Sequence, residues 1–302
     1  MAASEVFDHL VIGGGSAGCV LARRLGERPG ARVLLLEAGG SDRHPLIDMP
    51  FGFGAITHDP NFSWLFDSVP EPALGGRRVR LPRGRRLGGS SAINGMLYVR
   101  GQHEDYDDWA RLGAHGWGWQ EVLPWFRHAE DQSRGADEWH GTGGPLHVGD
   151  LALRDPLSDA IIAAAEAIGL PRNEDFNGVR QLGVGYFQAN IRDGRRWSAA
   201  RGYLRGWPGL GRSVEVVTNA VATRVLFDGD RRAVGVEYRR GGRLQTVHCS
   251  GEVIVAAGAF QSPALLQASG IGPGELLQGL GIPVVADRAQ VGPTCRTISA
   301  CR

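Results

Sequence analysis

The strongest constraint on the fold is a glycine turn near the start of the chain. A strand-type apolar segment, residues 7–12, leads into the turn, and a helix-type segment, residues 20–25, follows it. The turn has G-x-G-x-x-G spacing, with glycines at Gly13, Gly15 and Gly18. The first glycine permits the sharp bend, the second lets the backbone approach a pyrophosphate, and the third lets the helix pack closely on the strand. The helix N-terminus then offers N–H groups and a positive dipole end to phosphate.

A second buried strand, residues 32–36, ends in an acid, Glu37. The acid follows the last glycine by about 20 positions, where a carboxylate binds ribose hydroxyls. Together these features predict an α/β fold that binds a dinucleotide. The alternative interpretation is a Gly-rich surface loop and an ordinary exposed glutamate.

The composition excludes several classes of protein. With a net charge of +1, the chain lacks the basic footprint of a nucleic-acid-binding protein. No window reaches the roughly 18 apolar residues of a membrane-spanning helix, and residues 1–6 lack the basic start of a signal peptide. We predict reduced thiols in a cytoplasmic protein, and no metal site, because metal-type spacing is absent from the cysteines, which are Cys19, Cys249, Cys295 and Cys301.

A second segment also suggests anion binding. Residues 77–86 are rich in arginine and lead into Gly88-Gly89-Ser90-Ser91 and an apolar helix start. Backbone N–H groups, hydroxyls and guanidinium groups all bind phosphate. The alternative is a solvated basic loop. The preceding residues, 44–72, predict an irregular excursion that covers or lines a site, and Trp64 within it is as readily explained by core packing.

The remaining chain predicts a helix over 121–130, a helix that starts at Asp155-Pro156, and a hairpin turn at Asp193-Gly194. A β-meander of short antiparallel strands then follows, over residues 214–217, 222–227, 234–238 and 244–248. A buried strand over 252–260 returns to the first sheet, and a helix begins at Ser262-Pro263.

Three stretches resemble the glucose-methanol-choline (GMC) family of FAD-dependent oxidoreductases. They are residues 12–18 with 37–39, residues 84–107, and residues 258–272, and the resemblance extends from about residue 6 to about residue 292. Within the family, the sequence is most similar to the choline-dehydrogenase-like and bacterial alcohol dehydrogenase branch. The resemblance implies a Rossmann-like FAD-binding domain with an antiparallel β-meander, formed by residues 1–150 and 202–302, and a substrate domain of which residues 151–201 are the first part.

The resemblance also implies cofactor-binding residues. The residues implied beside the pyrophosphate are Gly13, Gly15, Ser16 and Gly18, and Glu37 would bind the adenosine ribose. The residues implied beside the flavin are Arg86, Leu87, Gly89, Asn94, Gly95, Met96 and Leu97, and Val221 would lie beside the adenine. Ala17, Ala38 and Trp64 belong to the same set, and Ala257 and Gly258 would close over the FAD. Family members with covalent flavin carry a histidine just before this asparagine. Ile93 occupies that position, so we expect non-covalent FAD.

The implied chemistry is hydride transfer from a small-molecule alcohol to flavin N5, with oxygen, a quinone or another carrier as electron acceptor. The family takes the hydroxyl proton on a histidine near its C-terminus. None of the nine histidines here lies in a matching context, so we assign no catalytic residue. We expect a cytoplasmic enzyme. Membrane association of the full-length enzyme stays open. The alternatives are a catalytically inactive FAD-binding remnant and a nicotinamide-dependent dehydrogenase.

The last ten residues depart from the family. Residues 294–301 can be encoded so that the frame starting one base earlier reads Asn-Leu-Gln-Asp-His-Leu-Arg-Leu, which resembles the segment that follows in the family. We therefore hypothesise a frameshift near residue 293 that truncates the family sequence before its catalytic histidine segment. An in-frame stop with no family-like sequence downstream in any frame would contradict this.

Overall fold

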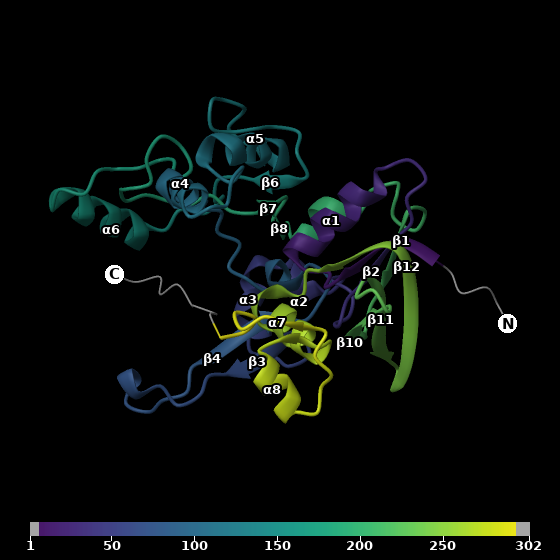
Figure 1. The fold of residues 1–302 in the computed structure, drawn as a ribbon. Helices are drawn as coiled ribbons and strands as arrows, with labels where there is room; N and C mark the ends of the chain where they lie inside the picture. The colour runs from purple at the N-terminus through teal and green to yellow at the C-terminus, as the bar shows by residue number, and fades with distance from the viewer. Residues whose placement is uncertain (1–5, 294–302) are drawn as a thin grey trace. The chain divides into compact units, whose positions relative to one another are not determined.

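The computed structural model describes residues 6–293 (Figure 1). The predicted frameshift product, apart from Pro293, lies outside these residues. The chain forms two compact units. The first comprises the described residues up to His44, Gly54–Ile93 and the described residues from Ala199 on, and the second comprises Pro45–Phe53 and Asn94–Ser198. Residues 94–150 thus pack within the second unit, while the predicted division into cofactor and substrate domains stays a prediction.

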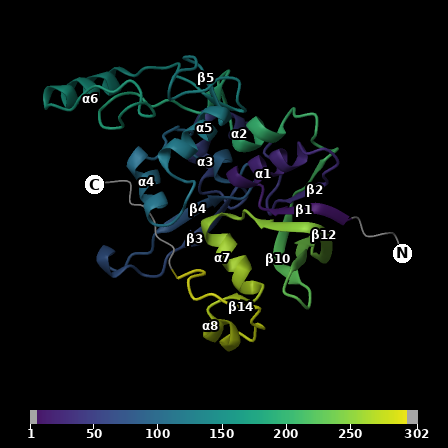
Figure 2. The same ribbon diagram turned by 45° about the horizontal axis from the view of Figure 1, so that its top comes forward.

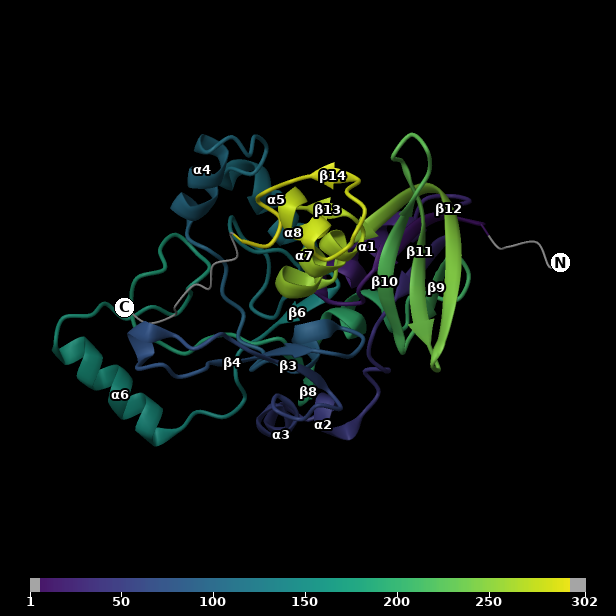
Figure 3. The same ribbon diagram turned by 60° about the horizontal axis from the view of Figure 1, so that its bottom comes forward.

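The first unit is built on one sheet of mixed direction, in the order β10-β11-β12-β1-β2-β9. Its strands are β1 (Val6–Ile12), β2 (Val33–Leu36), β9 (Val214–Val217), β10 (Ala220–Phe227), β11 (Ala233–Arg240) and β12 (Arg243–Val255). The half formed by β12, β1, β2 and β9 is parallel. The half formed by β10, β11 and β12 is antiparallel (Figure 3). The predicted combination of a Rossmann-like sheet and an antiparallel meander is therefore confirmed.

Alternate residues of the parallel strands enter different cores, as the period of a strand requires. Val11 and Leu35 pack with helix α1 (Ser16–Gly26) and a π-helix at Ala200–Leu204. On the other face, Leu10 and Leu36 belong to the core that includes Leu265 of helix α7 (Gly258–Ala268). The two helices lie on either side of β1 (Figure 2). A sheet covered on both faces explains why these strands are continuous apolar runs.

Two details of the predicted meander are wrong. Residues 214–217 form a parallel edge strand beside β2, because a short apolar run carries no information on the direction of its partner. Residues 244–255 lie in one strand, β12, which pairs antiparallel with β11 and then parallel with β1. Gly251 lies where the pairing with β1 shifts register, and a Cβ there would come within 2.4 Å of the Asp8 carbonyl oxygen.

The predicted start of the last long helix is also wrong. α7 begins at Gly258 and contains Pro263, whereas the Ser-Pro pair predicted a start at Ser262. Gly258 has φ +85°, a conformation that glycine adopts without strain, and it bends the chain directly from β12 into α7. The unit is completed by the hairpin β3 (Ser63–Asp67) and β4 (Arg80–Gly84), by 3₁₀ turns at Pro72–Leu74 and Gly89–Ala92, and by β13 (Ile271–Gly272), α8 (Gly274–Gly279) and β14 (Ala286–Asp287).

The second unit has little regular structure. It contains α2 (Pro45–Asp48), a 3₁₀ turn at Pro50–Gly52, α4 (His103–Arg111), α5 (Trp119–Ala129), β5 (Glu130–Gln132), β6 (Leu146–Val148), α6 (Pro156–Ala167) and the hairpin β7 (Ile191–Arg192) and β8 (Arg195–Arg196); α3 (Phe53–Ile56) crosses the unit boundary. The helices α5 and α6 and the turn at Asp193-Gly194 confirm three sequence predictions. The segment over 44–72 is less irregular than predicted. Its helices and strand were missed because each is too short to show a periodic pattern of apolar residues.

A buried charged network connects separate segments of the second unit. Arg100 Nη2 donates to Glu130 Oε2 at 2.8 Å, and both side chains are almost fully buried. His140 lies between two carboxylates, with Nδ1 at 3.1 Å from Glu130 Oε2 and Nε2 at 3.0 Å from Asp175 Oδ2. Burial alone would lower the pKa of His140, but hydrogen bonds to Asp175 and Glu130 and their charges outweigh it and raise the pKa to about 9. His140 is therefore protonated at neutral pH.

None of the helices within residues 6–293 has the length and apolar character needed to cross a bilayer.

Candidate cofactor site

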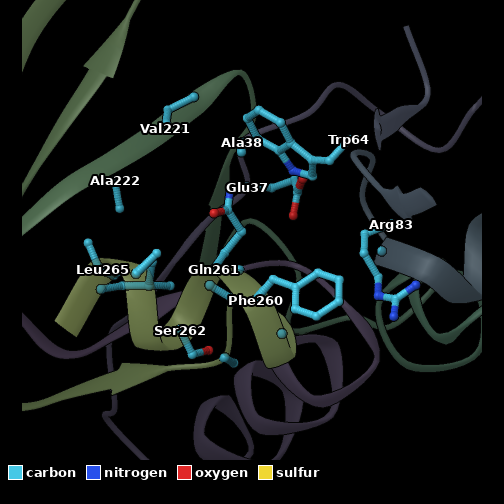
Figure 4. A pocket seen from close by; sticks show the side chains of 18 of the residues that line it. Glu37, Ala38, Trp64, Arg83, Val221, Ala222, Phe260, Gln261, Ser262 and Leu265 are labelled. Carbon is cyan, nitrogen blue, oxygen red and sulfur yellow. The ribbon is translucent and has the colours of Figure 1, made fainter. Parts of the chain in front are cut away.

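The first unit contains a cavity of about 700 Å³ at the carboxyl ends of its parallel strands (Figure 4). Its wall includes the ends of β1 and β2, the starts of α1 and α7, the first part of β10, and the hairpin formed by β3 and β4. Open α/β sheets bind ligands outside the carboxyl ends of their strands. The cavity is also within the size range of small-molecule and cofactor sites.

The glycine turn forms one side of this cavity, and its geometry requires glycine. Gly13 has φ +102°, and a Cβ there would lie 2.5 Å from the Ala256 carbonyl oxygen. A Cβ on Gly18 would lie 1.8 Å from the Gly13 carbonyl oxygen, so α1 can approach the turn only because residue 18 has no side chain. At Gly15 the nearest atom would be Gly89 Cα at 3.9 Å, which leaves space beside the backbone.

The N-terminus of α1 faces this cavity through Ser16 and Ala17. The N-cap residue of α1 is Gly15, which has no side chain to accept a hydrogen bond from the first N–H groups of the helix. The first turn of α1 also contains no acidic residue. Helix N-termini carry a partial positive charge and orphan N–H donors. This end of α1 therefore suits an anionic group such as a pyrophosphate.

Glu37, directly after β2, stabilises the glycine turn through hydrogen bonds. Its side chain is buried, with Oε2 accepting from the Gly14 N–H at 2.8 Å and Oε1 from the Gly39 N–H at 2.7 Å. Burial raises the pKa of Glu37 to about 7, although the hydrogen bonds from Gly39 and Gly14 and the charge of Arg85 oppose this shift. Each carboxylate oxygen keeps acceptor capacity for a further donor, such as a ribose hydroxyl.

An aromatic and guanidinium cluster forms the opposite wall. The Arg83 guanidinium carbon lies 4.6 Å from the Phe260 ring centroid, and Phe260 meets Phe66 edge to face at 5.5 Å. Trp64 stacks near Phe66 and lies under Arg85 at 4.3 Å. Trp64 and Phe66 share one face of β3, and Arg83 is the register partner of Trp64 on β4. These groups provide flat apolar surfaces beside positive charge, which suit an anionic aromatic ligand.

The structure brings most of the predicted site residues together. Those that line the cavity are Gly13, Gly15, Ser16, Ala17, Glu37, Ala38, Trp64, Gly89, Val221, Ala257 and Gly258. Gly18 lies behind them, in the contact between α1 and the turn. Sequence reasoning missed Phe66, Arg83, Thr223 and the side chains on the first turns of α7, which are Phe260, Gln261, Ser262 and Leu265 (Figure 4). The available signal was the two-residue spacing of Trp64 and Phe66, which places both on one face of a strand.

Other predicted residues lie elsewhere. Arg86 and Leu87 are not among the lining residues that the structure describes. The Arg86 guanidinium instead packs over the Phe62 ring at 4.6 Å, and Leu87 packs with the α1 core. Asn94, Gly95, Met96 and Leu97 belong to the second unit. There, Asn94 Oδ1 accepts from the Met96 N–H at 3.1 Å, and Met96 has φ +64°.

Fold and cavity together define a dinucleotide-binding protein of the Rossmann type. The turn leaves space where a pyrophosphate would lie, α1 presents uncapped donors to it, and a buried carboxylate follows at the next strand end. This donor set fits the adenosine diphosphate portion of FAD.

Comparison with known proteins identifies the family. Residues 7–292 match the family model described as GMC oxidoreductase, and the chain belongs to that family, as its motifs predicted. It is 46% identical over 285 residues to an oxygen-dependent choline dehydrogenase of Rhizobium johnstonii, a match that covers 94% of this chain and 51% of the relative. The corresponding enzyme of Brucella anthropi is 44% identical over 285 residues, with the same coverage. The chain thus spans about half the length of the curated relatives it matches.

Solved structures agree with this assignment. Pyridoxine 4-oxidase from Mesorbium loti has a TM-score of 0.87 and 36% identity, and the match covers 93% of this chain and 55% of that enzyme. Formate oxidase from Aspergillus oryzae RIB40, whose FAD modification was studied, has a TM-score of 0.86 and 27% identity, with coverage of 95% and 51%. The GMC family and the formate oxidase neighbour bind FAD, so the prediction of an FAD-type α/β fold is confirmed.

Proposed function

We propose that this chain is the FAD-binding part of an oxidoreductase that acts on the CH–OH group of a small alcohol. The observation that carries the proposal is the cavity at the ends of β1 and β2, bordered by the Gly13–Gly18 turn, the uncapped start of α1 and buried Glu37. When bound, FAD would supply the chemistry of accepting hydride from the alcohol carbon at flavin N5. The family membership and the choline dehydrogenase relatives support this class of reaction.

The proposed roles follow the chain. The N–H groups around Gly15, Ser16 and Ala17 bind the pyrophosphate, and Glu37 accepts from the adenosine ribose. Val221 lies beside the adenine, and Trp64, Ala38, Ala257 and Gly258 complete the wall around the cofactor. Arg86, Leu87, Gly89 and the segment from Asn94 to Leu97 serve the flavin half. We propose 1–150 with 202–302 as the cofactor domain and 151–201 as part of the substrate domain.

We propose that FAD is held without a covalent bond. Ile93, which precedes Asn94, is buried and apolar and has no nucleophilic atom to bond to the flavin. We also propose a cytoplasmic location, which the free thiols of buried Cys19 and Cys249 support. Oxygen, a quinone and other carriers are all candidate electron acceptors. Measuring oxygen consumption during alcohol oxidation distinguishes oxygen from the other acceptors.

The purified chain is expected to carry a visible flavin spectrum. Whether choline or a primary alcohol bleaches this spectrum under anaerobic conditions tests the activity of this chain. Heat treatment should release the flavin into the supernatant if it is non-covalent. A flavin spectrum that no alcohol bleaches would contradict the oxidoreductase activity of this chain and support an inactive FAD-binding protein. A chain that binds NAD but no FAD would contradict the assignment as a whole.

The affinity for FAD is expected to rise by about tenfold between pH 5.5 and pH 8, because Glu37 must be ionised to accept well from ribose. Glu37 has a pKa raised to about 7, so its contribution to stability is fully present below pH 4.5 and is lost as pH rises through about 7 in the cofactor-free chain. Binding favours the ionised form and releases a proton. Fluorescence titration of FAD across this pH range measures the slope.

The matched substitutions for this titration are Glu37→Gln and Glu27→Gln. Glu37→Gln should bind FAD more weakly at pH 8 and show a flat pH profile. Glu27 lies on the exposed end of α1 and pairs with Arg23 and Arg24, so its replacement should leave the profile unchanged. A profile that keeps its slope in Glu37→Gln would show that another group titrates.

A further inference from the structure

Among the described residues that line the cavity of the first unit, Arg83 of β4 is the one cationic side chain. The one acidic side chain is Glu37, whose oxygens accept from backbone N–H groups. Arg83 is half-buried, and in the described part of the chain no carboxylate lies within ion-pair distance of its guanidinium. On the same strand, Arg80 differs in this respect, because it pairs with Asp67. A half-buried cation that lines a cavity without an acidic partner suits an anionic ligand.

The strand that carries Arg83 is anchored to the glycine turn. The next residue, Gly84, packs so closely on Gly89 that an added Cβ would lie 2.2 Å from the Gly89 carbonyl carbon. A Cβ on Gly89 would in turn lie 2.7 Å from Gly15 Cα, within the turn at which α1 begins. These backbone contacts leave no room for side chains. They hold the end of β4 next to the proposed pyrophosphate site.

Phe260 supports the Arg83 guanidinium and leaves most of its hydrogen-bond donors available (Figure 4). The guanidinium carbon lies 4.6 Å from the Phe260 ring centroid, and Phe260 meets Phe66 edge to face. A cation–π contact involves the face of the ring and uses no N–H donor. Nη1 donates to the Pro82 carbonyl oxygen at 2.8 Å, and the remaining guanidinium N–H groups have no acceptor among the described residues. The planar fork can therefore bind oxygens of a ligand.

The charges around the cavity leave a pyrophosphate incompletely compensated. A pyrophosphate diester carries about one negative charge per phosphate group. The N-terminus of α1 supplies only about half an elementary charge of the opposite sign. Glu37 adds further negative charge when it is ionised. Arg83 is the lining residue that can offset the remainder, and an arginine can bind two phosphate oxygens at once.

We propose that Arg83 binds the diphosphate of the dinucleotide directly and is its counter-charge in this cavity. This inference rests on the proposed function, which assigns the cavity to the adenosine diphosphate portion of FAD. It adds a charged contact from β4 to the backbone contacts of the glycine turn. A role for Arg83 in packing alone makes a different prediction, because packing against the adenine does not depend on the phosphates.

Titrating the FAD-free chain with ADP and with adenosine separates the two roles, since these ligands share the base and the ribose and differ in the diphosphate. Arg83→Gln should weaken ADP binding by about tenfold or more and change adenosine binding by less than about twofold. Arg83→Lys keeps the charge but not the fork, and should lose less ADP affinity than Arg83→Gln. The matched control is Arg80→Gln, which removes an exposed arginine of β4 and should leave both affinities unchanged.

Salt dependence gives a second measurement that needs no adenosine binding. Raising the salt concentration from about 0.05 M to about 0.5 M should weaken ADP binding more in the wild-type chain than in Arg83→Gln, because salt screens the contact that the variant lacks. If Arg83→Gln does not fold, Arg83→Lys replaces it in the titrations and should lose affinity for ADP but not for adenosine.

Two results would overturn the proposal. One is an equal loss of affinity for ADP and adenosine, which would make Arg83 a packing residue. The other is an ADP affinity and salt dependence that do not change in Arg83→Gln. A wild-type chain that binds neither FAD nor ADP would overturn the proposed function as well, whereas a chain that binds FAD with an ADP affinity independent of Arg83 would overturn this inference alone.

Discussion

Gly18→Ala is expected to lower the free energy of unfolding by about 3 kcal/mol and to abolish retention of FAD. The added Cβ would lie 1.8 Å from the Gly13 carbonyl oxygen, so either α1 or the turn must move. Both are backbone elements of the proposed pyrophosphate site, and neither can rotate away as a flexible side chain could. Urea unfolding and FAD titration of the purified variant measure the two effects.

The matched control is Gly54→Ala. A Cβ at Gly54 meets nothing within 4 Å, and its backbone needs no left-handed conformation. It lies in α3, so alanine should leave the stability unchanged or raise it by up to about 1 kcal/mol. Equal stability and FAD affinity in the two variants would mean that α1 tolerates displacement and that its close approach to the turn does not matter.

Glu130→Ala is expected to destabilise the second unit by about 3–5 kcal/mol, the usual effect of removing one partner from a buried ion pair. Glu130 is fully buried and accepts from Arg100, His140 and the Gly141 N–H. Its removal leaves the Arg100 guanidinium and the protonated His140 without their shared carboxylate. Thermal unfolding and limited proteolysis of the second unit test this expectation.

Two further variants show whether charge or packing causes the loss. Asp67→Ala breaks an exposed pair with Arg80 and should leave the melting temperature unchanged, because solvent screens such pairs. The double variant Arg100→Met/Glu130→Leu removes both charges and should recover part of the stability that Glu130→Ala loses. If the double variant is less stable than Glu130→Ala, packing around Arg100 contributes more than its charge.

The parts of the site that could be predicted are those whose geometry is local in the chain. The Gly13–Gly18 spacing is a property of one turn and the helix after it, and Glu37 follows at the end of the next strand. Each residue acts on atoms a few positions away or on the neighbouring strand, so a pattern of residue types reports the geometry directly. The family resemblance extended this to Val221 and Gly258, which also line the cavity.

The errors concern partners that are distant in sequence. Residues 214–217 are as apolar as a meander strand, but their position beside β2 makes them parallel. The Arg86 guanidinium packs on the Phe62 ring, a contact that the arginine-rich segment itself does not reveal. Phe260 forms part of the cavity wall by packing against Arg83, which is far from it in the sequence. Side-chain composition alone does not identify such partners.

The sequence by itself determined the nucleotide-binding turn, its acidic partner and the family, because these depend on residue types at short, fixed spacings. Only the tertiary structure decided the direction of β9, the continuity of β12, and the arginine and aromatic wall of the cavity. It also decided the burial of Arg196, whose guanidinium donates to the Asn94 carbonyl oxygen. The reason is that burial and pairing depend on contacts between residues far apart in the chain, and these exist only once the sheet has formed.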